Sequence, residues 1–167
     1  RTANYWKLWI SRELGSGCET LPPKVLWLLR QSLLIVRTQI DNGGAIIAAN
    51  DTNILSFARD TYSYMWPRDG AFVASALIKA GYVEVTRRFL YLCHQIVTPY
   101  GYFLHKYSPD GSVGSSWHPW FREGRHELPI QEDETALVLW TLWLFFERVH
   151  DLEFIKPLYR RLIIKSA

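Results

Sequence analysis

The chain has 167 residues, which is enough for one domain or for part of a larger one. Hydrophobic residues make up 49% and charged residues 21%, a balance typical of a globular rather than a disordered protein. The formal net charge is only +3, and the basic residues are spread along the chain in nothing longer than pairs such as Arg87-Arg88. This argues against a nucleic-acid surface, which needs a concentrated basic face.

The N-terminal segment, residues 5–14, carries several aromatic and aliphatic side chains and ends at Gly15. We expect a short helix or linker that packs on a neighbour. Residues 1–20 are assigned to a linker segment and residues 21–167 to one domain.

Apolar periodicity then predicts helices over about 24–39, 69–79, 82–97 and 131–150, with a further helix beginning at Asp151. Residues 98–128 are rich in Gly, Pro and Ser and form a long connection, of the kind that is functional or mobile in compact proteins. No strand alternation of any length occurs, so the predicted class is all-α. The second and fourth of these helices are rich in small residues or apolar nearly all round, which indicates inner helices that are buried on every side.

The cysteines, Cys18 and Cys93, match no metal-ligand spacing, and each is expected to be a buried thiol. The histidines show no i, i+4 pairing, so we predict no metal and no other cofactor; they are His94, His105, His118, His126 and His150. The most apolar stretch, 136–146, is too short to span a bilayer. No signal-peptide pattern opens the chain, and we expect an internal piece of a longer protein, with the cytoplasm favoured as its compartment.

Two polar clusters stand at the predicted starts of the buried helices. Arg68-Asp69 follows a tyrosine-rich turn and Trp66-Pro67. An N-terminal cap explains the aspartate as well as a sugar site does, because carboxylates satisfy free backbone N–H groups there. In a sugar site the arginine would supply forked donors, and the carboxylate would accept two hydroxyls.

The second cluster is Gln131-Glu132-Asp133-Glu134. A solvated acidic first turn, favoured by the helix dipole, is the alternative to a functional role. Adjacent carboxylates on one helical turn point in different directions, whereas a glycosidase pair must flank the bond across several ångströms. We therefore do not assign this cluster as a catalytic pair.

Three segments in order give a more specific signal: DNGGAIIAA at 41–49, YMWPRDG at 64–70 and QEDETAL at 131–137. Together they resemble the bacterial and archaeal branch of family 15 glycoside hydrolases, the glucoamylase-like enzymes. The resemblance implies an (α/α)6 barrel with its active site where the inner helices begin, and this chain would supply about the first four to five helices.

The resemblance also implies site residues. Arg68 and Asp69 would bind the glucosyl unit at the non-reducing end, Tyr62 would lie beside that sugar, and Trp66 would line the same pocket. Gln131 and Asp133 match a motif near the site. Fungal relatives place a sugar-stacking Trp where Glu127 stands here, and Trp117 or Trp120 could substitute for it.

The family inverts configuration, with one carboxylic acid protonating the glycosidic oxygen while a carboxylate activates water. Both carboxylates are expected downstream of Ala167, so the chain alone should be inactive. The expected partners are an α-glucan oligosaccharide or α-glucoside and the remainder of the polypeptide, or a second copy, because apolar inner faces such as Leu139, Trp140 and Trp143 would lack neighbours. The alternatives are a non-catalytic carbohydrate-binding or scaffold protein, and a disaccharide phosphorylase.

Overall fold

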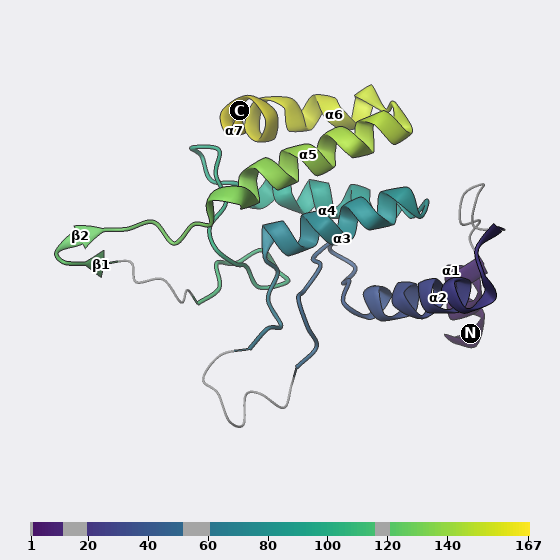
Figure 1. Cartoon of the computed structure of the whole chain (residues 1–167). Helices are drawn as coiled ribbons and strands as arrows, with labels where there is room; N and C mark the ends of the chain where they lie inside the picture. The colour runs from purple at the N-terminus through teal and green to yellow at the C-terminus, as the bar shows by residue number, and fades with distance from the viewer. Residues whose placement is uncertain (1, 12–19, 52–60, 116–120) are drawn as a thin grey trace.

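The computed structural model describes residues 2–11, 20–51, 61–115 and 121–167, and it is mostly helical (Figure 1). The helices are α1 (Thr2–Ser11), α2 (Pro23–Thr38), α3 (Pro67–Lys79), α4 (Val83–Ile96), α5 (Glu132–Val149) and α6 (Leu152–Leu158), with a π-helical turn, η3 (Tyr159–Ile163), leading into α7 (Ile164–Ser166). The five helices predicted after the linker are confirmed to within two residues at each printed start. Pro23 and Pro67 occupy the first helical turn, where the missing N–H of proline is tolerated.

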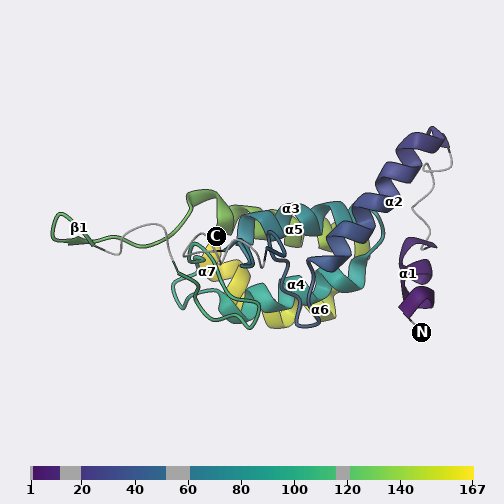
Figure 2. The same ribbon diagram turned by 90° about the horizontal axis from the view of Figure 1, so that it is seen from below.

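The all-α prediction needs one correction. A short antiparallel hairpin, β1 (Phe121–Arg122) and β2 (Arg125–His126), lies inside the predicted long connection. Its turn uses Glu123 and Gly124, both with positive φ, which matches the twist that two-residue hairpin turns require. Four paired residues are too few to produce a visible alternation in the sequence. The hairpin projects away from the helices (Figures 1 and 2).

Helices α3 and α5 make the most extensive helix contact in the described chain, and they run side by side with their N-termini at the same end (Figure 1). Small residues and hydroxyls line this contact. The hydroxyl oxygens of Ser75 and Thr141 lie 3.1 Å apart across this contact, and both hydroxyls donate to the carbonyl of Ala71. Small residues of α3 therefore lie where α3 and α5 meet.

Helix α4 covers the other side of this pair through Phe89, Leu90 and Cys93, all of which are fully buried. Gly70 of α3 is required here, because a Cβ at this position would lie 2.5 Å from the Phe89 ring. Cys93 is the buried thiol that was expected, and burial raises its pKa well above the ordinary value. Cys18 lies outside the described residues.

Helix α1 docks through Trp9, as expected of a short helix on a neighbour. The indole N–H donates to the carbonyl of Leu33 at 2.9 Å, and the Tyr82 hydroxyl donates to the carbonyl of Trp9. Helix α2 buries only Leu33 and extends from the body of the molecule (Figure 2).

The expectation that α5 is buried on every side is wrong for the described chain. Val138, Leu142 and Phe145 are buried, whereas Trp140 and Trp143 are 42% and 56% exposed. This exposure agrees with the expectation that apolar inner faces lack neighbours here. Within the described residues, none of the helices combines the length and the apolar character needed to cross a bilayer.

Candidate sugar-binding site

The first turns of α3 and α5 meet at one end of the helix pair, and Arg68 joins them. Its guanidinium donates to the side-chain oxygen of Gln131 and lies 3.3 Å from the Asp69 carboxylate and 3.6 Å from that of Asp133. The side chain of Arg68 is 32% exposed, against 46% for Asp69 and 52% for Asp133. The result is a half-exposed cluster with one cation between two carboxylates.

Capping does not explain this cluster. The N-cap residues of α3 and α5 are Trp66 and Gln131, and neither side chain makes a capping hydrogen bond. Asp69 and Asp133 lie in the first turns of α3 and α5, where the helix dipole favours their charge, and both carboxylates form ion pairs with Arg68. The polar groups therefore contact one another across the two helix starts and do not act as side-chain caps.

Beneath this cluster lies Glu134, a fully buried carboxyl. Neither of its oxygens accepts a hydrogen bond of ordinary geometry. Burial raises its pKa to about 9, against the lowering influence of Arg68 and with a smaller raising influence from Asp133 and Asp69. Glu134 is therefore a neutral acid near pH 7, and the net charge of the surrounding cluster is set by Arg68, Asp69 and Asp133.

Aromatic rings form a wall beside the cluster. The rings of Tyr62 and Trp66 lie 5.7 Å apart with a tilt of 31°, and Tyr64 meets Trp66 edge-on at 6.3 Å. Tyr62 is 49% exposed and Trp66 only 4%, so Tyr62 is the ring that faces solvent and Trp66 supports it. The Lys106 ammonium lies over both Tyr64 and Trp66, at 4.5 and 5.2 Å from the ring centroids.

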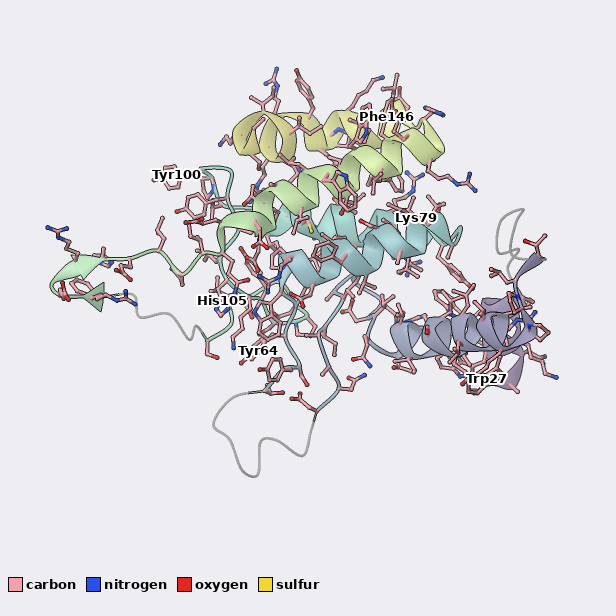
Figure 3. All side chains as sticks on the ribbon, viewed as in Figure 1. Trp27, Tyr64, Lys79, Tyr100, His105 and Phe146 are labelled. Atoms are coloured by element: carbon pink, nitrogen blue, oxygen red, sulfur yellow. The ribbon has the colours of Figure 1, made fainter. Side chains whose placement is uncertain are left out.

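A backbone pairing brings the second half of this wall into place. Met65 and Tyr107 exchange both of their N–H···O hydrogen bonds, at 2.8 and 2.9 Å. This pairing sets His105 and Lys106 beside Trp66, and Figure 3 shows His105 and Tyr64 together near the start of α3. Residues of the predicted long connection are thus part of the site and not merely a surface loop.

Asp51 holds the strand-like segment that carries Tyr62. Its carboxylate accepts hydrogen bonds from the Tyr62 backbone N–H at 2.9 Å and from the hydroxyls of Thr61 and Ser63. These bonds lower the pKa of Asp51, with the Thr61 hydroxyl as the largest cause. Asp51 therefore holds the backbone of Tyr62, and the contact with Trp66 holds its ring.

Beside Asp69 runs a groove of about 340 Å³, lined mainly by apolar side chains of α2, α3 and residues 46–48. Asp69 and Gln39 are its polar lining residues. Its volume lies in the range of ligand pockets. Like such pockets, it has apolar walls and few polar groups.

All six residues predicted for sugar binding are thus connected in space. Arg68 contacts Asp69, Gln131 and Asp133, and it directly follows the Trp66-Pro67 corner on which the Tyr62 ring rests. Sequence reasoning missed the contributions of Asp51, His105 and Lys106. It included Glu134 in the second polar cluster, but a solvated acidic turn does not describe this side chain, which is fully buried.

Of the outer-subsite predictions, Glu127 lies just beyond the hairpin and forms a 3.6 Å ion pair with Arg122. Trp117, Trp120 and His118 lie outside the described residues. Within residues 2–11, 20–51, 61–115 and 121–167, no group of three or more His, Cys, Asp and Glu side chains is arranged to hold a metal ion.

Comparison with known proteins identifies the family of the chain. A family described as "Glycosyl hydrolases family 15" matches residues 27–158, which include every residue of the site. A protein of Methanocaldococcus jannaschii named as an uncharacterized glycosyl hydrolase is 24% identical over 170 residues, covering 98% of this chain and 24% of the relative. The chain therefore spans about a quarter of that relative's length. No solved structure matches the chain. The chain belongs to glycosyl hydrolase family 15.

Proposed function

We propose that the chain forms the glucosyl-binding part of an exo-acting, inverting glycoside hydrolase that releases glucose from α-glucosides. The observation that carries this proposal is the Arg68 junction, in which one guanidinium joins Asp69, Gln131 and Asp133 across the starts of two helices. Membership of family 15 supplies the class of reaction, hydrolysis of a glycosidic bond.

The proposed roles follow from the chemistry of these groups. The Asp69 carboxylate, with 46% of its side chain exposed, accepts hydrogen bonds from vicinal hydroxyls, and Arg68 donates to a hydroxyl oxygen from its planar fork. Gln131 and Asp133 orient the guanidinium. Tyr62 offers an exposed ring to the apolar face of the pyranose.

The same proposal assigns the architecture. In it, residues 21–167 form the first helices of an (α/α)6 barrel, with α3 and α5 in the inner ring and α2 and α4 outside. The exposed faces of Trp140 and Trp143 support this assignment, since inner helices of a complete ring have neighbours on both sides. The remainder of the polypeptide is then the partner that covers them.

The catalytic acid and base belong, in this proposal, to the part of the protein downstream of Ala167. The acid transfers its proton to the glycosidic oxygen as the C1–O bond breaks. The base takes a proton from the water that attacks C1 from the opposite face. Asp133 and Glu134 do not serve as this pair, because they are adjacent on one turn and Glu134 is fully buried.

The decisive experiment is glucose release from maltooligosaccharides and from trehalose, measured for the complete polypeptide and for this chain alone. We expect release by the former only, with β-glucose as the first product detected by proton NMR. Arg68→Ala in the complete polypeptide should abolish release, while Arg122→Ala, on the exposed hairpin, should not.

Two outcomes would support the alternatives instead. Binding of the sugars without hydrolysis by the complete polypeptide would indicate a carbohydrate-binding protein. Release that depends on inorganic phosphate and yields glucose 1-phosphate would indicate a phosphorylase.

A further inference from the structure

We propose that His105 is a positioning residue, which holds the indole of Trp66 beneath Tyr62 and occupies that indole's N–H inside the protein. The part of this inference that concerns sugar binding rests on the proposed function. His105 had no assigned role in the sequence.

The contact between the two rings is specific. The Trp66 indole N–H donates to Nε2 of His105 at 3.2 Å, with the rings nearly perpendicular and their centroids 6.1 Å apart. An accepting Nε2 requires the neutral imidazole with its proton on Nδ1. Both residues are buried, at 4% and 1% exposed, so water does not compete for this bond.

The backbone fixes His105 on both sides of the contact. Its own N–H donates to the carbonyl of Pro129, in the segment that leads into α5. Two residues later, Tyr107 pairs with Met65, the residue just before Trp66. The position of the imidazole is therefore fixed relative to the starts of α3 and α5. Through its hydrogen bond, the imidazole fixes the position of the Trp66 indole.

The consequence concerns how the site recognises a sugar. Because the indole N–H is occupied by His105, Trp66 contributes no hydrogen bond to a ligand and acts as a support for the exposed Tyr62 ring, 5.7 Å away. Selection among hydroxyl patterns then falls to Arg68 and Asp69. Loss of the His105 acceptor should free Trp66 to turn and weaken the hold on Tyr62.

Two variants of the chain test this inference. His105→Gln keeps an acceptor near the place of Nε2, whereas His105→Leu has similar volume and none. His126→Leu, on the exposed hairpin, is the matched control. The first readout is hydrogen exchange of the Trp66 indole proton, identified by its loss in Trp66→Phe, and the second is the dissociation constant for maltose.

We expect exchange of this proton to rise about three- to tenfold in His105→Leu, the range for loss of one buried hydrogen bond, and maltose affinity to fall by a similar factor. His105→Gln should restore most of both, which a merely space-filling role would not allow. Unchanged exchange in His105→Leu would overturn the inference, as would increased exchange with unchanged affinity. If the complete polypeptide neither binds nor hydrolyses the sugars, the proposed function is refuted, and the exchange readout alone then decides whether His105 holds Trp66.

Discussion

The two ends of the α3–α5 pair differ in the side chains that they carry. Beyond the first turn, the helices pack through Ala71, Ser75 and Thr141 and against the buried ring of Phe89, with hydroxyls satisfied by nearby carbonyls. At the N-terminal end, the first turns of the same helices carry Arg68 and four carboxyl side chains. Packing does not require this concentration of polar groups, since the adjoining turns associate without it. The packed end stabilises the fold, and in the proposed function the polar end binds the sugar.

The largest effect should come from the packing region. Phe89→Ala removes a fully buried ring that contacts Gly70, and we expect it to lower the free energy of unfolding by about 3–5 kcal/mol. Tyr91→Ala, on the same helix but 49% exposed, should cost less than about 0.5 kcal/mol. Urea unfolding measures both. An equal loss of unfolding free energy in the two variants would contradict the assignment of Phe89 to the packed side of α4 and Tyr91 to its exposed side.

The next effect belongs to the site end. Arg68→Ala should weaken maltose binding by about 1.5–3 kcal/mol, since the arginine makes charge-assisted hydrogen bonds, and should leave the free energy of unfolding nearly unchanged. Arg68→Lys keeps the charge but loses the planar fork, and should recover only part of the affinity. Isothermal titration calorimetry measures the affinities. An Arg68→Ala variant that unfolds as readily as Phe89→Ala would show that this end is structural as well.

Glu134 sharpens the comparison through its pH dependence. Its folded-state pKa is raised to about 9 from an ordinary 4.5, so the folded protein binds one more proton than the unfolded chain between these values. Stability must therefore fall as pH rises through this window, by at most about 1.4 kcal/mol per pH unit.

Glu134→Gln should remove this slope, so that the variant equals the wild type near pH 5 and exceeds it in stability near pH 8. Urea unfolding at a series of pH values measures the difference. Asp133→Asn, at an exposed neighbour, serves as the control and should keep the slope. A wild-type profile that is flat from pH 5 to pH 8 would contradict the assignment of a neutral Glu134.

The smallest effect on stability concerns the exposed side of α5. Trp143→Ser removes an indole that is 56% exposed, and we expect a change below about 0.5 kcal/mol in the free energy of unfolding. Exposed apolar surface promotes association, so sedimentation velocity should show less self-association in this variant. Trp143→Phe should behave as the wild type does. Identical sedimentation of all three proteins would show that this face drives no association.

Local patterns were sufficient for some of these features. The run of small and apolar residues after Asp69 predicted α3 to within two residues of its start, and Gln131 with the acids after it predicted the start of α5. The three motifs indicated the family, which the comparison confirms. The positions of the helix N-termini that carry Arg68 and Asp133 depend on residues close in the sequence, so local patterns can predict them.

The rest depended on pairings that no local pattern encodes. Trp66 and His105 are 39 positions apart, and they meet because Met65 pairs with Tyr107. The surrounding Gly, Pro and Ser residues predict an exposed loop. The four consecutive side chains from Phe103 to Lys106 are nevertheless buried or half-buried, which the composition of the segment does not indicate. Asp51 reaches Tyr62 in the same way, through hydrogen bonds across the chain from residue 51 to residue 62.

The most direct test of the site is a titration of the isotopically labelled chain with maltose, followed by NMR. The account predicts shifts of the Arg68 side-chain N–H and of the backbone N–H groups of residues 68–70 and 131–134, with the hairpin residues 121–126 unchanged. Shifts confined to other surfaces, or none at saturating sugar in a folded chain, would contradict the assignment of the α3 and α5 starts as the sugar-binding site.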